Sequence, residues 1–506
     1  MKLRPEDFQS VAREEVAKTA QRDFVIMVAG VFNYLCDTAM GAYGDKEEQD
    51  KARALGAQIR ENTLHNLPQL LEEFEKNATS NGIQVLWAAD AEEACQLVKG
   101  LVEKHQVKTI TKGKSMISEE IGLNHFLEQE TGVKIYEGDL GEFIVQQRGT
   151  LPFHIVGPAI NLTVQEIASI LQEHIDMPYT ETAAEIVSYV RTFLRDKFER
   201  ADMGITGVNQ AIASTGSLIL VENEGNIRWV TSAPRVHVAL MSIEKVCASF
   251  ADAFHLLGLL TRNCTGQAIT SYVSILNGPR RDDEEDGPEA MYVVIVDNGR
   301  SAAYQDPHLK EALRCIRCGR CGIQCPIYGR VGAYPYGWCY PGPMGNVIAP
   351  LIMGLDRTRD LYEACTLCGG CQSVCPGGTP HLDLISRYRH MKVTGDERFG
   401  GTRVSLKERA AFELMNRGMQ NPALYKSGLK IARSYINRRS QDGYISSLPG
   451  PMSGWFTCRD FPQLPEKSFR ERWQEDLQRE AAQLAGSAAA QQEAAAHNYH
   501  LKHRPR

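Results

Sequence analysis

CIRCGRCGIQCP, residues 315–326, places four cysteines within eleven residues, and CTLCGGCQSVCP, residues 365–376, repeats the same spacing 50 positions later. Both copies read C-x2-C-x2-C-x3-C-P. Three thiolates separated by gaps of two residues can converge only if the backbone wraps around a body several ångströms across, and glycines inside each copy relieve crowding where it does so. The repeat therefore predicts two loops that each close around an inorganic body.

The spacing is that of two-cluster ferredoxins, in which a cubane 4Fe-4S cluster takes three cysteines from one copy and the fourth from the other. We therefore predict two 4Fe-4S clusters. The first set is Cys315, Cys318, Cys321 and Cys375, and the second is Cys365, Cys368, Cys371 and Cys325. Crossed ligation would hold the clusters close enough for electron exchange. A pair of zinc sites, which also use C-x2-C units, is the alternative, and iron content distinguishes the two.

Fourteen cysteines in a long chain without an export signal favour metal ligation over disulfides. Six of them are scattered singly, and we expect buried structural thiols at Cys36, Cys95, Cys247, Cys264, Cys339 and Cys458. For Cys339, which lies between the two copies, a role as a ninth cluster ligand is the alternative. The 40 residues from Cys325 to Cys365 far exceed the connection in a small bacterial ferredoxin. We therefore expect an α-helical ferredoxin module, in which helices carry the binding loops.

Composition excludes several classes of function. With a net charge of -6, the chain lacks the excess of positive charge that favours binding to nucleic acid or to an anionic membrane. The first fifteen residues are charged throughout and lack the apolar core of a signal peptide. The longest apolar runs, 24–36 and 347–355, fall short of the roughly 20 residues that span a bilayer. We expect a cytoplasmic protein with no transmembrane segment, for which docking to a membrane partner stays open.

The pattern after Gly82 indicates an open α/β sheet. Short apolar runs at 83–89, 107–111 and 133–139 alternate with amphipathic segments, which is typical of βαβ units and a parallel sheet. Further strands are expected at 217–223, 271–277 and 291–299. The acidic stretch between the last two is predicted to be a solvated hairpin loop, with a partner-docking loop as the alternative.

A length of 506 residues suggests about three domains with flanking segments. We divide the chain into a helical N-terminal cap, an α/β domain, the two-cluster ferredoxin domain, a C-terminal helical region and a charged, Ala/Gln-rich tail. These parts are residues 1–80, 81–305, 306–395, 396–465 and 466–506, respectively. The tail has too little apolar variety for a core, so a frayed helix or disorder is expected there.

No substrate-oxidising motif is visible. No G-x-G-x-x-G follows a predicted strand, and TKGKSM (111–116) lacks the first glycine of a phosphate loop. Polar clusters still follow several strands, the usual place for a ligand crevice in an open α/β sheet. The candidate lining residues are Lys112, Lys114, Glu119, Glu120, Asp139, Glu142, Asn223 and Glu224. Turn chemistry and helix capping explain many of them equally well, with Ser118 and Glu119 placed to start a helix.

The first half of the chain resembles the lactate-utilisation domain through KGKSM, EEIGLN, DLGEFIVQ, HIVGPAI, TGSLILVENEGN and VHVALMSIEKV. The second half is similar to the iron-sulfur B subunit of a three-part lactate-utilisation complex. It shares CIRCGRCGIQCPIY, YGWCYPGPMG, CTLCGGCQSVCP and LPGPMSGWFTCRDFP, in that order. The likeness runs from about residue 20 to 475. Two features depart from the family pattern, namely Cys339, where an aliphatic residue is expected, and the Ala/Gln tail. Neither departure changes a predicted cluster ligand.

The resemblance implies a subunit that carries electrons as L-lactate is oxidised to pyruvate. It implies A-type and C-type partner subunits and a downstream acceptor, either a quinone-linked chain or a carrier protein. It also implies a CoA-transferase-like fold for the α/β domain. Two alternatives stay open: the iron-sulfur subunit of another redox complex, such as glycolate oxidase or a heterodisulfide-reductase-like system, and an iron-sulfur redox-sensing protein.

Overall fold

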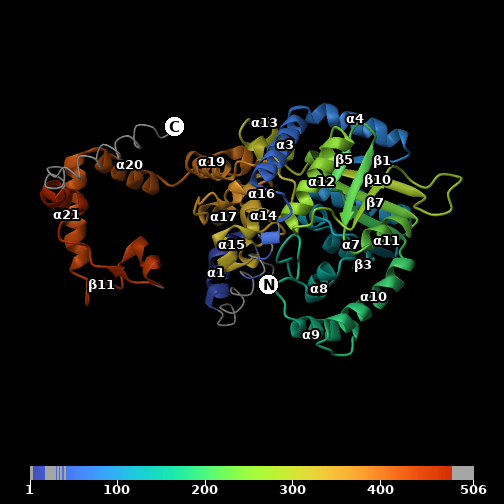
Figure 1. The fold of residues 1–506 in the computed structure, drawn as a ribbon, viewed down its shortest axis with the longest axis horizontal. Helices are drawn as coiled ribbons and strands as arrows, with labels where there is room; N and C mark the ends of the chain where they lie inside the picture. Colours follow the sequence, from blue (N-terminus) through green and yellow to red (C-terminus); the bar gives the residue numbers. More distant parts are fainter. Residues whose placement is uncertain are drawn as a thin grey trace. The chain divides into compact units, whose positions relative to one another are not determined.

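A computed structural model of the chain describes residues 4–17, 41–457 and 459–480, together with residues 30, 34, 37 and 38. Two compact units are present, residues 1–404 and residues 405–506 (Figure 1). The finer division into five parts stays a prediction. Cys36, Cys458 and residues 481–506 of the tail lie outside the described residues. Across the part of the chain that is described, no helix is long and apolar enough to cross a membrane.

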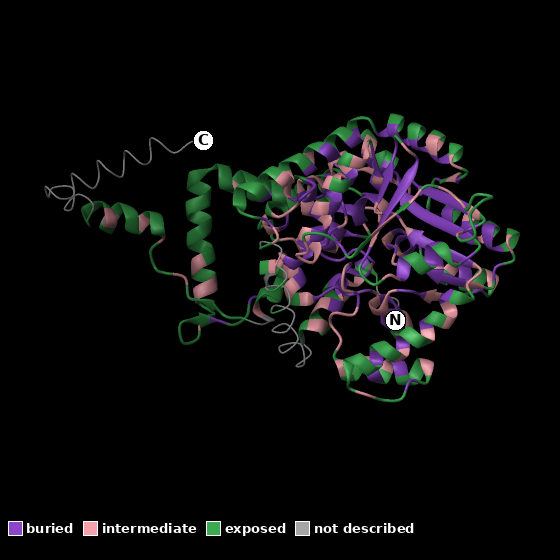
Figure 2. Ribbon diagram, turned by 45° about the vertical axis from the view of Figure 1, so that its right-hand side comes forward, coloured by how far each residue is buried: buried purple, intermediate pink, exposed green. Residues whose placement is uncertain are grey.

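The core of the first unit is a six-stranded sheet of order β1-β10-β7-β4-β2-β3, in which all neighbours run parallel. Its strands, in that order, are Gln84–Ala88, Ala290–Val296, Val236–Ser242, Met203–Gly207, Thr109–Lys112 and Lys134–Glu137. Strand β7 is buried at every residue and β10 at all but its first (Figure 2). Continuous apolar runs of this kind are typical of strands covered on both faces. The predicted α/β fold with a parallel sheet is confirmed.

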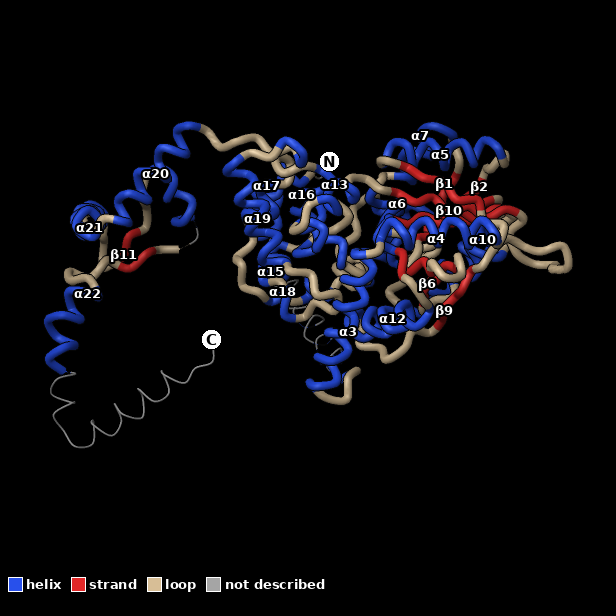
Figure 3. Tube along the Cα trace, turned by 90° about the horizontal axis from the view of Figure 1, so that it is seen from above, coloured by secondary structure: helices blue, strands red, loops and turns tan. Residues whose placement is uncertain are grey.

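Helices cover both faces of this sheet. Side chains alternate along β10. Tyr292 and Val294 pack with helices α5 (Ala91–Lys104) and α7 (Leu123–Thr131), whereas Met291 and Val293 pack with α4 (Leu67–Ser80). Figure 3 shows the same two layers on either side of the strands. The bounds of the helices of this part are α3 Lys46–His65, α4 Leu67–Ser80, α5 Ala91–Lys104, α6 Met116–Glu120, α7 Leu123–Thr131, α8 Leu140–Arg148, α9 Val164–Ile175, α10 Ala183–Glu199, α11 Asn226–Ser232, α12 Phe250–Cys264 and α13 Arg300–Gln305.

The start of α6 differs from the prediction. The helix begins at Met116, and its cap is Ser115, whose hydroxyl accepts the backbone N–H of Ser118 at 3.3 Å. Ser118 and Glu119 therefore lie inside the helix and do not start it. The sequence offers two serines three residues apart, and only Ser115 has the extended backbone that a capping residue needs.

A second, four-stranded sheet has the order β8-β5-β6-β9, with β8 Val246–Cys247, β5 Gln210–Ile212, β6 Ser217–Glu222 and β9 Tyr272–Leu276. Strand β9 pairs antiparallel with β6, whereas β10 lies between β1 and β7 in the large sheet. The predicted hairpin between β9 and β10 is therefore wrong. Residues 280–286 between these strands are exposed, as expected of an acidic loop, but they link two sheets.

The described residues 306–395 contain helices and no strand. Their bounds are η3 Leu309–Arg314, α14 Arg320–Ile323, α15 Pro326–Val331, η4 Tyr334–Tyr336, α16 Gly342–Met353, α17 Arg359–Glu363, α18 Gly370–Ser373 and α19 His381–Thr394. Helix α16 is the centre of this part, since its residues from 342 to 351 are all buried. The second unit contains α20 Leu406–Gln420, α21 Pro422–Asn437, β11 Tyr444–Ile445, β12 Phe461–Pro462 and α22 Phe469–Arg472.

Candidate functional site

The two cysteine loops follow the same backbone path. Arg317 and Leu367 both have left-handed backbones, with φ of 62° and 54°. In each loop the N–H of that residue donates to the sulfur of the first cysteine, Cys315 or Cys365, at 3.4 Å. Residues other than glycine rarely adopt this backbone conformation. Its presence at the same position of both loops therefore indicates a shared requirement of the site. An N–H aimed at sulfur stabilises the charged thiolate.

The fourth cysteine of each copy lies with the other copy. Cys325 lines a small cavity together with Cys365, Cys368 and Cys371. Burial raises the pKa of Cys375, and the neighbouring Cys315 raises that pKa further. Cys325 thus lies with three cysteines of the second copy, and Cys375 lies near Cys315 of the first.

The donors fit the predicted cofactor, because thiolates are the ligands of 4Fe-4S clusters and the second set encloses a cavity. Among the residues described, no three His, Cys, Asp or Glu side chains converge as the ligands of a single metal ion. The assignment of each cysteine as a ligand stays a prediction.

The two sets differ in their exposure. In the first set, Cys318 is buried, and its loop packs against the α/β part, where His154 lies 3.4 Å from the carbonyl oxygen of Gly319. In the second set, Cys368 is exposed to solvent. The first loop therefore faces the protein interior, and the second reaches the surface.

Two glycines at equivalent positions of the loops provide a matched test. Gly319 and Gly369 have φ of 75° and 81°. A Cβ at Gly319 would lie 2.9 Å from the ring of His154, whereas one at Gly369 would meet only Leu382, at 3.7 Å. Both alanine variants should lose about 1–2 kcal/mol to the left-handed backbone. Gly319→Ala should lose about 1–3 kcal/mol more through overpacking.

Thermal unfolding of both variants under anaerobic conditions, monitored by cluster absorbance, checks this expectation. We expect the lower unfolding temperature and the faster release of iron from Gly319→Ala. Equal behaviour of the two variants would show that His154 does not constrain the first loop.

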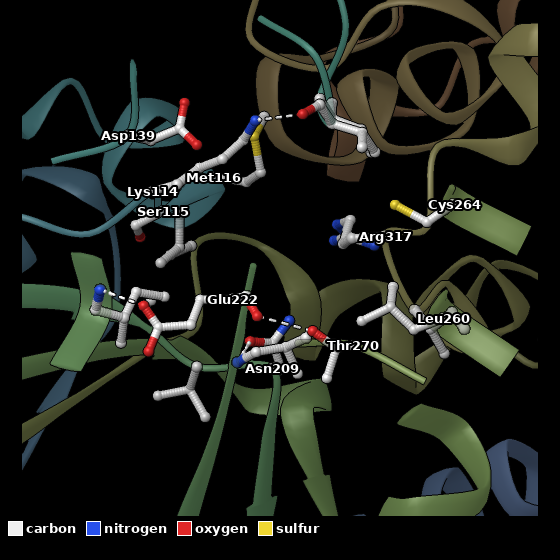
Figure 4. Close-up of a pocket in the computed structure, with 18 of the residues that line it drawn as sticks. Lys114, Ser115, Met116, Asp139, Asn209, Glu222, Leu260, Cys264, Thr270 and Arg317 are labelled. Carbon is white, nitrogen blue, oxygen red and sulfur yellow. Dashed lines mark hydrogen bonds between the residues drawn. The ribbon is translucent and has the colours of Figure 1, made fainter. Parts of the chain in front are cut away.

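A cavity of about 230 Å³ opens at the carboxyl ends of the parallel strands (Figure 4). Lys114 and Ser115 follow β2, Asn209 follows β4, Lys245 follows β7, and Arg317 comes from the first cysteine loop. Strands β2 and β4 are neighbours in the sheet although β3 lies between them in the chain. The chain thus reverses its direction of travel across the sheet at this point, where open α/β sheets usually bind ligands.

Half of the predicted crevice residues line this cavity, namely Lys114, Asp139, Asn223 and Glu224. The other four, Lys112, Glu119, Glu120 and Glu142, are not among its lining residues and form ion pairs. Lys112 is buried between Glu119 at 2.7 Å and Glu137 at 2.8 Å. Burial lowers the pKa of Lys112, but the two carboxylates outweigh that effect and raise it above its usual value. The ammonium is therefore charged in the folded protein.

A second buried network joins the cysteine loop to the sheet. Glu244, just after β7, pairs with Arg300 at 3.0 Å and with Arg317 at 2.9 Å. Arg300 also pairs with Glu120 at 2.7 Å. Burial raises the pKa of Glu244, but the two arginines outweigh that effect and bring it to about 2. The carboxylate is thus ionised and fixes the position of Arg317 at the cavity wall.

Lys245 differs from the other cations of the site. It is half-buried and lines the cavity, and no acidic side chain among the described residues lies within 4.0 Å of its ammonium group. Burial and the nearby charge of Arg317 lower its pKa to about 8. At neutral pH the cavity therefore contains an ammonium group without an ion-pair partner.

Among the scattered cysteines, Cys95, Cys247 and Cys339 are buried, as expected. Cys339 is 1% exposed and packs in the apolar core around α16. Cys264 is half-buried and lines the cavity, in contrast to the expectation of a buried thiol.

Three family models match successive parts of the chain. Residues 71–296 match the LUD domain, residues 311–379 the 4Fe-4S dicluster domain, and residues 387–478 the C-terminal domain of lactate utilisation protein B. Lactate utilization protein B of Bacillus licheniformis is 41% identical over 85% of this chain and 88% of its own length. The Bacillus pumilus protein of that name is 37% identical over 95% of this chain and 99% of its own length. The Bacillus subtilis protein of that name is 38% identical over 91% of this chain and 95% of its own length.

The chain belongs to the lactate utilization protein B family. The resemblance inferred from the motifs is confirmed, and this family member is a lactate-utilisation iron-sulfur protein. A solved structure, that of a DUF162 family protein from Deinococcus radiodurans, covers 46% of this chain and 98% of its own at 14% identity, with a TM-score of 0.26. That score is too low to support a structural comparison.

The residues that connect the LUD and dicluster domains of this member of the lactate utilization protein B family were not predicted from the sequence. Arg317, Glu244 and Lys245 were not among the candidates. One signal was available, because Arg317 occupies the position that Leu367 holds in the second copy. The adjacent charged residues Glu244 and Lys245, directly after the largely apolar stretch 236–243, were a second signal.

Proposed function

We propose that the chain is the electron-transfer subunit of a multi-subunit complex that oxidises L-lactate to pyruvate. The proposed partners are A-type and C-type lactate-utilisation subunits and a quinone-linked or protein acceptor. The observation that supports the proposal most is the placement of Cys325 beside the second cysteine loop, since interleaved loops are what two adjacent clusters need.

The proposed ligands are the two crossed sets, and a 4Fe-4S cluster bound at each would supply one-electron chemistry. The chain's own groups would set the conditions for that chemistry. The N–H groups of Arg317 and Leu367 donate to cysteine sulfurs, and hydrogen bonds of this kind tune the potential of a cluster. Arg317 also places a positive charge beside the first set.

The difference in exposure supports a direction for the electron path. The first cysteine loop lines the LUD-domain cavity through Ile316 and Arg317, and the second set reaches solvent through Cys368. In the proposal, electrons pass between the interior and a partner that docks at the surface near Cys368. We further propose that the dicluster module is of the α-helical ferredoxin type and that the LUD domain has a CoA-transferase-like fold.

Anaerobically purified chain should contain about eight iron atoms, four for each cluster. It should show little oxidation of L-lactate alone and steady turnover once the A-type and C-type subunits are added. The measurements are iron and sulfide content and the reduction of an artificial acceptor.

Zinc in place of iron would remove the basis of the proposal. Turnover by the purified chain without partners would contradict the division of labour. Reduction of the assembled complex by glycolate but not by L-lactate would assign the chain to a different 2-hydroxy acid.

A further inference from the structure

The cavity at the ends of β2, β4 and β7 has two cationic side chains, Arg317 and Lys245, at the wall nearest the first cysteine loop. Each of its three acidic residues accepts a backbone N–H: Asp139 from Glu142, Glu222 from Ile227 and Glu224 from Asn223. One oxygen of Glu222 is buried without a hydrogen-bond partner among the described residues, and burial raises the pKa of this carboxyl. Glu244 pairs with Arg317 at 2.9 Å and forms no ion pair with Lys245. An anion at this wall would give Lys245 the partner that it lacks.

The size and the polar groups of the cavity limit the ligand. A volume of about 230 Å³ is smaller than the roughly 300–1,000 Å³ of pockets that hold drug-sized ligands, so a molecule of few heavy atoms fits better than a nucleotide. Asn209 uses its carbonyl oxygen to accept the N–H of Val221, which leaves its amide N–H groups as donors. Ser115 and Tyr340 supply hydroxyl groups to the same cavity.

We propose that this cavity binds a small carboxylate of the 2-hydroxy or 2-oxo acid class, with the carboxylate against Lys245 and Arg317 and the oxygen at carbon 2 near Asn209. The choice of this class of acid rests on the proposed function, whereas the location rests on the cavity itself. Arg317 lies between Cys315 and Cys318 in the chain, so the bound carboxylate lies beside the loop of the first predicted cluster. Its negative charge should make that cluster harder to reduce.

The test uses the full-length, cluster-loaded chain under anaerobic conditions. Pyruvate, L-lactate, acetate and inorganic phosphate are titrated separately by calorimetry, and the potentials of both clusters are measured with and without pyruvate. We expect saturable binding of pyruvate and L-lactate, weaker binding of acetate, and a lower potential for one of the two clusters when pyruvate is bound.

Lys245→Gln should weaken the binding of pyruvate about 10-fold to 100-fold, which is the value of a hydrogen bond to a charged group. Lys245→Arg should restore part of the affinity, because it retains the positive charge. Lys76→Gln is the matched control, since Lys76 is exposed on α4 and does not line the cavity. Iron content is measured in every variant, so that loss of a cluster is not mistaken for loss of binding.

Three results would overturn the inference. The first is a chain with full iron content that binds neither pyruvate nor L-lactate. The second is wild-type affinity in Lys245→Gln, and the third is tight binding of phosphate with no binding of either acid. A change of cluster potential in Lys245→Gln without any binding of acid by the wild type would show that Lys245 only balances the charge of the cluster. In each case the proposed function is judged separately, by iron content and by turnover in the complex.

Discussion

Alanine at both Cys325 and Cys371 should remove one cluster and leave the other, so that iron falls from about eight to about four atoms per chain. Both cysteines line the same small cavity, although one belongs to each copy of the motif. Under crossed ligation the double variant damages the second set alone. The first set retains all four of its thiolates and should keep its cluster.

The matched control changes two cysteines of a single copy, Cys321 and Cys325. Under crossed ligation these residues belong to different clusters, so this double variant should lose both and contain almost no iron. If each copy held its own cluster, the two double variants would exchange their results. Iron and sulfide assays, together with electron paramagnetic resonance of the reduced protein, distinguish the two outcomes without assuming any geometry.

The cysteine sets could be proposed from sequence because their geometry is mostly local. Within each copy, short gaps fix which thiolates can converge, and the left-handed residues Arg317 and Leu367 recur at the same offset. The parallel sheet was predictable for a similar reason, since the alternation of apolar runs and amphipathic helices is visible in any short window. Both patterns are visible among residues that are near one another in the chain. The exchange of Cys325 and Cys375 between the two copies is not local, and its prediction rests on the spacing of two-cluster ferredoxins.

The errors involve contacts between distant residues. The predicted hairpin failed because nothing within 271–299 reveals that β9 and β10 join different sheets. The pairing of Glu120 with Arg300 joins residues 180 positions apart, so Glu120 was read as a crevice residue. The pairing of Glu244 with Arg317 likewise spans 73 positions. A charged residue after a strand has the same appearance in the sequence whether it faces a ligand or a buried counter-ion.

Methionine at Arg300 should destabilise the first unit by about 3–5 kcal/mol, the cost of breaking a buried ion pair by removing one partner. Arg300 is 2% exposed and holds both oxygens of Glu120, at 2.8 Å and 2.7 Å, as well as Glu244. Glu244 would keep its ion pair with Arg317, whereas Glu120 would lose its only ion-pair partner among the described residues. Chemical denaturation of the cluster-loaded protein, followed by tryptophan fluorescence, measures the loss.

Two further variants determine whether the uncompensated charge is the cause. Arg195→Met removes an exposed pair with Glu199 on α10 and should cost no more than about 0.5 kcal/mol. Adding Glu120→Gln to Arg300→Met should recover part of the stability, because a neutral amide is less costly to bury than an unpaired carboxylate. If the second change recovered nothing, the loss would come from packing of the arginine side chain. If Arg300→Met itself cost no more than Arg195→Met, the network would not stabilise the junction between sheet and cysteine loop.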